Sequence, residues 1–268
     1  MRKNAWVICC CTAVLAAFGT FFRWLQDQVC FEAETGLAVR GSIWPYAVAL
    51  MIVIAAVVLA VVCFRMKNQP HTSFPDSLPA AFAAAQRVRT IGGIVLGALL
   101  AVGGAWLMIS SGTLSSPGLQ RVLAVLAIVT GAAFARQMLA PGDAEATSGA
   151  VVCASMPIVL LAFWLIVSYK VNIINPTISA YAVEILALCA ALIAFYQLAG
   201  FAYGRPKAIK SIFWSQFAAF LCITALPDDR AGAQQLMLAA IAGILVFQSY
   251  LTASNIRPAV SGPVGGVQ

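Results

Sequence analysis

The chain has 268 residues, of which 62% are hydrophobic and only 9% are charged, whereas a soluble domain carries about 25% charged residues. A hydrocarbon solvent explains this composition, because apolar side chains can then face outward as well as inward, so we expect an all-α, polytopic integral membrane protein in contact with the lipid bilayer. The net charge of +7 is scattered among apolar segments, which argues against nucleic acid as a partner.

Eight apolar segments have the length of a membrane span, and each must be helical in lipid because its backbone polar groups need partners inside the segment. Together they predict one transmembrane domain, residues 1–268. The expected spans are approximately 5–22, 45–64, 91–110, 121–140, 150–168, 179–202, 211–226 and 235–252. The seventh segment, about 16 residues long, is the shortest, so a bundle of seven spans is the alternative.

The first span begins like a signal peptide, with Arg2 and Lys3 before the apolar run. No small-x-small cleavage site follows that run, which predicts an uncleaved first helix. Of the eight cysteines, only Cys30 is expected to lie outside the hydrocarbon.

A charged stretch, residues 21–37, follows this span. The helical spacing of its apolar residues predicts that the first helix continues along the outer interface, where Arg23 and Asp27 can pair at i, i+4. The acids Asp27, Glu32 and Glu34 have two interpretations: a solvated cap of the bundle, or an outer-loop contact for a cation or a basic partner.

The basic residues orient the chain. With eight spans and the N-terminus inside, eleven Lys and Arg face one side and five face the other, which fits the positive-inside rule for a bacterial-type cytoplasmic membrane. Both termini are then expected to be cytoplasmic. The eleven are Arg2, Lys3, Arg65, Lys67, Arg87, Arg89, Arg136, Arg205, Lys207, Lys210 and Arg257.

The third and fourth spans carry small residues four positions apart, including Gly93 and Gly97 in one and Gly131 in the other. Such stripes let two helix backbones approach closely, so these spans are predicted to form a tight antiparallel hairpin. The same three glycines are candidates for contacts in a homo- or hetero-oligomer.

Only two charged residues lie well inside the expected spans, and charge in a membrane span is costly. Glu184 is a candidate proton or cation ligand, or alternatively a buried partner of Lys170 at the end of the fifth span. Arg136 either reaches the cytoplasmic headgroups or contacts a substrate anion.

The deep amides Gln197, Gln216 and Gln248 can join helices by hydrogen bonds, or they can line a polar path. The acids of the stretch 227–230, Pro-Asp-Asp-Arg, can contact a cation, but the simpler interpretation is a solvated turn.

Sequence signatures of enzymes are absent. His71 is the one histidine, and no Cys-x-x-Cys, Gly-x-Ser-x-Gly or Walker-type loop occurs, so we expect no catalytic residues, no cofactor and no metal site. The sequence favours a small-molecule or ion transporter, or an accessory subunit of a transport complex. The alternative is a non-catalytic scaffold that acts through its packed helix faces; a membrane-embedded enzyme is disfavoured.

Overall fold

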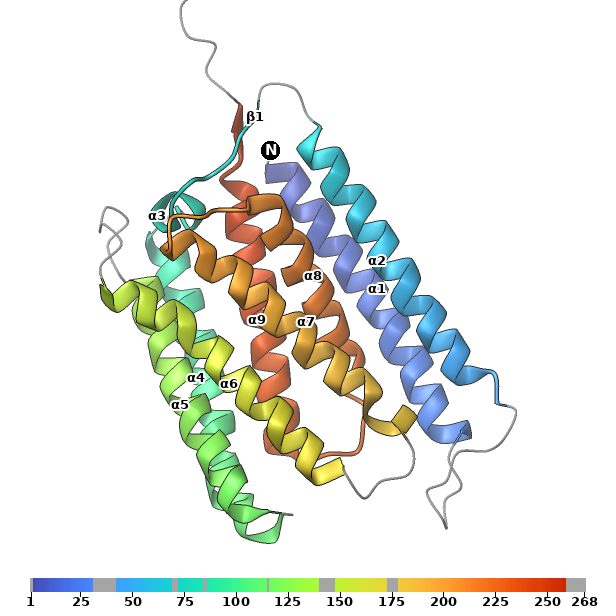
Figure 1. The fold of residues 1–268 in the computed structure, drawn as a ribbon. Coiled ribbons are helices and arrows are strands. Elements are labelled where there is room, and N and C mark those ends of the chain that lie inside the picture. Colours follow the sequence, from blue (N-terminus) through green and yellow to red (C-terminus); the bar gives the residue numbers. More distant parts are fainter. Residues whose placement is uncertain are drawn as a thin grey trace, which may run out of the picture.

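The computed structural model describes residues 2–30, 42–68, 72–83, 86–114, 116–139, 148–172 and 178–258, and these form a bundle of long helices (Figure 1). The elements are α1 (Arg2–Val29), α2 (Trp44–Lys67), β1 (Thr72–Ser73), α3 (Leu78–Ala81), α4 (Gln86–Ser110), η1 (Ser111–Thr113), α5 (Pro117–Leu139), α6 (Ser148–Asn172), α7 (Ile178–Ala202), α8 (Ala208–Thr224), α9 (Gly232–Ser254) and β2 (Arg257–Pro258).

The fold is the expected all-α polytopic bundle. Within the described residues, seven helices are long and apolar enough to cross a membrane, namely α1, α2, α4, α5, α6, α7 and α9. The eighth, α8, has 17 residues, or about 25 Å of helix against a hydrocarbon core of about 30 Å. It corresponds to the short seventh segment of the sequence, so the choice between seven and eight spans depends on this helix.

The two ends of the bundle contain different parts of the chain. Figure 1 shows that α1 begins and α9 ends at the same end, which we call the N/C end. The opposite end, which contains residues 225–231 between α8 and α9, is the distal end. Both ends of the described chain therefore lie at the same end of the bundle.

Burial is greatest in the C-terminal helices. In the most apolar part of each helix, 67% of α9 and 56% of α7 is buried, against 28% of α1 and of α2. The pair α1 and α2 lies on one flank of this centre, and α4, α5 and α6 lie on the other (Figure 1). The flanking helices therefore present most of their apolar surface outward.

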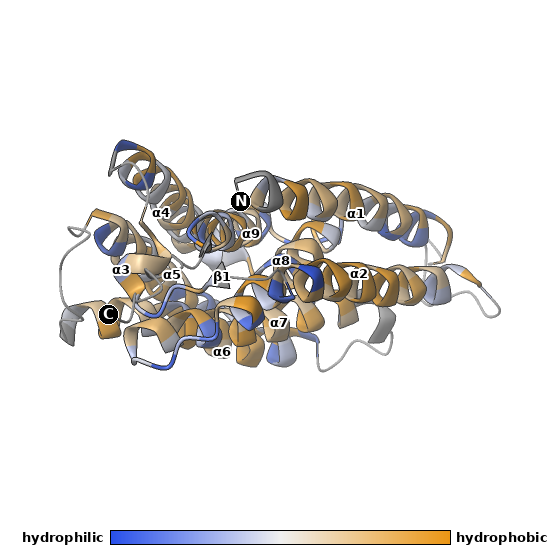
Figure 2. Cartoon of the chain, turned by 90° about the horizontal axis from the view of Figure 1, so that it is seen from above, coloured by the Kyte–Doolittle hydropathy of each residue, from blue (hydrophilic) through white to orange (hydrophobic). Residues whose placement is uncertain are grey.

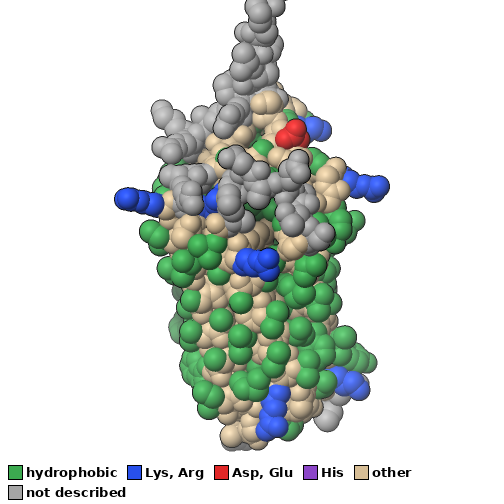
Figure 3. Space-filling view, turned by 90° about the vertical axis from the view of Figure 1, so that its left-hand side faces the viewer, with side chains coloured by type: hydrophobic (Ala, Val, Ile, Leu, Met, Phe, Trp, Pro, Cys, Tyr) green, Lys and Arg blue, Asp and Glu red, His purple; other side chains and the backbone are tan. Residues whose placement is uncertain are grey.

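The outward faces are suited to lipid. Large apolar side chains such as Val53, Val57 and Val61 of α2 are exposed. Figure 2 shows the helices predominantly in the colours of hydrophobic residues, and Figure 3 shows hydrophobic side chains along one flank, with Lys and Arg toward both ends. A hydrocarbon belt around the bundle would cover this surface.

The predicted hairpin of small residues is present as α4 and α5. A Cβ added at Gly97 would lie 2.5 Å from the carbonyl oxygen of Gly131, and one at Gly131 would meet the carbonyl oxygen of Gly97. Gly93 in turn faces Met138. These glycines thus bring two backbones together inside the chain. An oligomer contact through them stays a prediction, and the face it would use is already covered by a neighbouring helix.

The segment between α2 and α4 is connected to the end of the chain at the N/C end. β1 pairs antiparallel with β2, and the Asn255 side-chain amide donates to the carbonyl of Ala81 over 2.9 Å. This connection places Phe74 beside the start of α8, next to a groove described below.

Candidate functional site

At the distal end, a buried ion pair joins α1 to the connection between α8 and α9. The Nε of Arg23, near the end of α1, donates to Oδ1 of Asp228 over 2.6 Å, and their side chains are 1% and 5% exposed. The Nη1 of Arg23 also donates to Oε1 of Gln26 over 2.9 Å. Charges removed from water need such partners, because an isolated ion in a low-dielectric interior is strongly destabilising.

A second arginine extends this pair to α7. The Nη2 of Arg230 lies 2.7 Å from Oδ2 of Asp228 and 3.5 Å from Oε2 of Glu184, and the Arg230 side chain is 6% exposed. Glu184 is therefore buried beside Arg230. The predicted alternative partner, Lys170, is exposed at the end of α6, so that assignment was wrong.

Asp27 completes the group that we call the distal network: Arg23, Asp27, Glu184, Asp228 and Arg230. Its Oδ1 lies 3.7 Å from Nη2 of Arg23, which confirms the predicted i, i+4 pair. The network contains two guanidinium groups and three carboxylates from α1, α7 and the connection between α8 and α9.

Two other acids named with Asp27 cannot be placed. Glu32 and Glu34 lie outside the described residues, so their predicted outer-loop contact stays a prediction.

The connection between α8 and α9 is not the solvated turn that its sequence suggests. The side chains of Asp228 and Arg230 are 5% and 6% exposed, whereas Asp229 between them is exposed. The side-chain amide of Gln235, in the first turn of α9, donates to the carbonyls of Leu226 and Asp228 over 3.3 and 3.2 Å. The hydrogen bonds from Gln235 to its backbone carbonyls therefore hold this connection against the bundle, together with the ion pairs.

A polar pocket of about 210 Å³ adjoins the network. Glu184 and Arg230 line it together with Ser168, Asn172 and Gln120, among other residues. The Nη1 of Arg230 is buried and has no hydrogen-bond partner among the described groups. Asp229 lines the pocket as well, so the pocket offers two carboxylates, a guanidinium donor and several amide and hydroxyl groups to a small polar molecule.

The predicted amides lie in a different layer, nearer the N/C end. The side-chain amide of Gln216 on α8 donates to Oγ of Ser249 on α9 over 2.9 Å. Gln248, which precedes Ser249 in the chain, is 3% exposed. The Oε1 atoms of Gln216 and Gln248 have no partner among the described residues. Gln216 is eight residues before Thr224 at the end of α8, which is about 12 Å along a helix.

The remaining predicted residues belong to neither layer. Gln197 is half-buried on α7, and Arg136 is exposed near the end of α5. The Arg136 guanidinium lies close to Gly149 at the start of α6, where an added Cβ would be 3.3 Å from Nη2. This placement at the N/C end fits the expected contact of Arg136 with headgroups and keeps it away from the distal network.

The chain was compared with protein families, curated proteins and solved structures, and no family model, curated protein or solved structure matches it. Among the described residues, no group of three or more His, Cys, Asp or Glu side chains is arranged to hold a metal ion.

Proposed function

We propose that this chain is a membrane transporter, or a subunit of a transport complex, that binds a small polar solute or ion in the distal pocket. The observation that carries the proposal is the unpartnered Nη1 of Arg230, buried beside Glu184 in a polar pocket. Ionisable residues inside membrane bundles are costly and typically mark substrate or ion pathways, which makes them functional candidates by default.

Stability alone gives a weaker explanation of the distal network. Replacing a buried ion pair by well-packed apolar residues is often neutral or stabilising, so an ion pair is poor evidence for a stabilising role. A purely structural pair would also satisfy its donors, whereas one nitrogen of Arg230 is left without an acceptor. An acidic or carbonyl oxygen of a bound solute would supply that acceptor, and Glu184 would take a cationic part of the same solute.

The path beyond the pocket is apolar. The part of α8 between Gln216 and Thr224 reads Phe-Ala-Ala-Phe-Leu-Cys-Ile, and α9 is apolar from Leu236 to Phe247. The distal network and the layer of Gln216 and Gln248 are therefore separated by an apolar section of α8 and α9. This arrangement favours a carrier that rearranges between two states over an open pore.

The alternative of a scaffold has less support. It relied on helix faces lined by Gly93, Gly97 and Gly131, and those faces pack within the chain between α4 and α5. The exposed apolar surface of the flanking helices is explained by contact with lipid.

The proposed orientation places the distal end outside a bacterial-type cytoplasmic membrane and the N/C end inside, following the distribution of Lys and Arg. Cys30 is an unsuitable reporter, because it is 1% exposed and its Sγ lies 2.8 Å from Oγ of Ser42. Asp229 and Arg205, exposed at the distal and N/C ends, are better positions.

In a cysteine-free background, an impermeant thiol reagent should label Asp229→Cys in intact cells and Arg205→Cys only after lysis. The opposite pattern would refute this orientation, but it would not decide whether a solute binds in the distal pocket.

The proposed function is tested by uptake into proteoliposomes. The probes are labelled amino acids, polyamines and monovalent cations, because the pocket is lined by two carboxylates, Glu184 and Asp229, and one guanidinium, Arg230. We expect uptake of at least one probe, abolished by Glu184→Gln and by Arg230→Gln and retained by Gln197→Ala, which changes a half-buried amide outside the pocket. Uptake that is equal in all four proteins would exclude the distal pocket as the binding site.

A further inference from the structure

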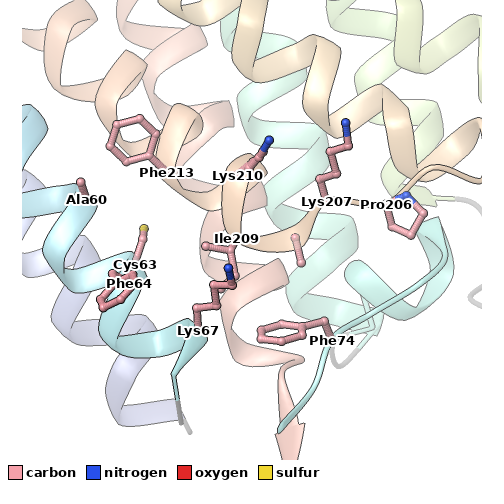
Figure 4. Close-up of a pocket in the computed structure, with 11 residues that line it drawn as sticks. Ala60, Cys63, Phe64, Lys67, Phe74, Pro206, Lys207, Ile209, Lys210 and Phe213 are labelled. Atoms are coloured by element: carbon pink, nitrogen blue, oxygen red, sulfur yellow. The ribbon is translucent and has the colours of Figure 1, made fainter.

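A second cavity lies at the N/C end, on the opposite side of the bundle from the distal pocket. It is a groove of about 540 Å³ between the last turns of α2, the start of α8 and the segment that carries Phe74 (Figure 4). Its walls are mainly apolar, with Ala60 and Phe64 on α2 and Phe213 on α8. Phe64 is 60% exposed, so this side of the groove opens on the surface that hydrocarbon would cover.

Three lysines line the same groove. Lys67 ends α2, while Lys207 and Lys210 flank the first residues of α8, and all three are exposed (Figure 4). No acidic residue is among its described lining residues; Asp76 follows Phe74 by two positions but does not line the groove. The groove therefore combines apolar walls with positive charge of a single sign.

The backbone adds to this positive potential. α8 begins at Ala208, in the wall of the groove, and no side chain caps its first turn. The first N–H groups of a helix have no partner inside the helix, and the helix dipole places a partial positive charge there. A helix of 17 residues that starts between two lysines is well arranged to receive an oxyanion.

We propose that this groove is a specific binding site for an anionic phospholipid. Its phosphate would lie at the start of α8 among Lys67, Lys207 and Lys210, and an acyl chain would run along the apolar wall formed by α2 and α8. The occupant must have both parts: a soluble anion would leave the apolar walls uncovered, and a neutral lipid would leave the lysines without a counter-charge. Basic pockets between membrane helices are a recurring form of headgroup recognition.

The site is tested on the purified full chain by native mass spectrometry, after removal of co-purified lipid. The probes are phosphatidylglycerol and phosphatidylcholine with the same acyl chains, and glycerol 3-phosphate as a headgroup without chains. We expect one phosphatidylglycerol to be retained at least tenfold more tightly than phosphatidylcholine, and no retention of glycerol 3-phosphate. Equal retention of the two lipids, or equally tight binding of glycerol 3-phosphate, would overturn the proposal.

Two variants locate the site. Lys67→Gln/Lys207→Gln/Lys210→Gln removes the charges, and we expect it to weaken the binding of phosphatidylglycerol by about 10- to 100-fold. Ala60→Trp keeps every charge but fills the apolar part of the groove, and it should weaken the binding of the same lipid.

The matched control is Arg65→Gln/Arg136→Gln/Arg205→Gln, which removes the same net charge from exposed positions at the N/C end that do not line the groove. If this control loses phosphatidylglycerol as strongly as the lysine variant, the attraction is a general surface charge, and the groove is not the site.

Discussion

The two ends of the bundle carry charge in different ways. At the distal end, the side chains of Arg23 and Asp228 are 1% and 5% exposed, and charges of both signs meet within 2.6 to 3.7 Å. At the N/C end, Lys67, Lys207 and Lys210 are exposed, and the groove between them has no acid among its described lining residues. One end thus pairs its charged groups with one another inside the bundle, while the other presents its charges outward.

This difference follows from solvation. A charge that leaves water must recover several kcal/mol from partners, so the distal arginines require nearby carboxylates. A lysine at the membrane surface keeps its ammonium hydrated and needs no protein partner. Removing one member of a buried ion pair at the distal end should therefore cost stability, whereas substituting the exposed lysines at the N/C end should alter lipid binding and leave stability unchanged.

The largest effect is expected at Asp228, because its carboxylate faces both buried arginines. Asp228→Leu leaves two guanidinium groups without this partner and should destabilise the fold by about 3–5 kcal/mol. Thermal unfolding in detergent measures the loss. The control is Asp229→Asn, which neutralises the adjacent exposed carboxylate and should leave the unfolding temperature unchanged.

A double-mutant cycle separates pairing from general damage. Arg23→Met/Asp228→Leu should be less destabilised than the sum of the two single variants, because the double variant leaves fewer charges buried without partners. Additive losses would show that the ion pair between Arg23 and Asp228 contributes no coupling of its own.

The second largest effect is expected between the two ends of the bundle, where α4 packs closely against α5. Gly131→Leu places a side chain against the backbone of Gly97 and should separate α4 from α5, at a cost of about 1–3 kcal/mol or more. Gly118→Ala is the matched control, since a Cβ there meets nothing within 4 Å. If Gly131→Leu unfolds at the same temperature as the parent chain, the close approach of these helices does not stabilise the fold.

The hairpin and the network also differ in how well the sequence predicts them. Small residues four positions apart and a short connection are local patterns, so α4 and α5 and their glycine contact were predictable. The helices themselves follow from apolar length, because lipid leaves the backbone no other way to satisfy its hydrogen bonds. The number of spans stays open because α8, with 17 residues, is shorter than the hydrocarbon core is thick.

The distal network could be predicted only in part. Glu184 was found because charge inside an apolar span is conspicuous, and the pair of Arg23 and Asp27 followed from helical spacing. The contact of Arg23 with Asp228 joins residues 205 positions apart, and no local pattern encodes it. A buried Asp228 and a solvated Asp229 look identical in the sequence, because burial is decided by the docking of α1 against α8.

A smaller effect is expected in the amide layer. Gln216→Leu removes the hydrogen bond to Ser249 and a long one to Sγ of Cys9, but it also removes a buried oxygen that has no partner, so stability should change by less than about 1 kcal/mol. Uptake by proteoliposomes then separates the two interpretations of this residue. Unchanged uptake would support a role of Gln216 in the hydrogen-bonded contact between α8 and α9, whereas lost uptake in a stable variant would place Gln216 on the path of the solute.

The smallest effect on folding is expected from the groove lysines. Lys67→Gln/Lys207→Gln/Lys210→Gln should leave the unfolding temperature in detergent alone unchanged, because exposed substitutions away from special contacts rarely alter stability. Adding phosphatidylglycerol should raise that temperature for the parent chain but not for this variant, since a ligand stabilises a fold only in proportion to its occupancy. A lower unfolding temperature without lipid would instead mean that these lysines stabilise the fold, and the contrast between the two ends would fail.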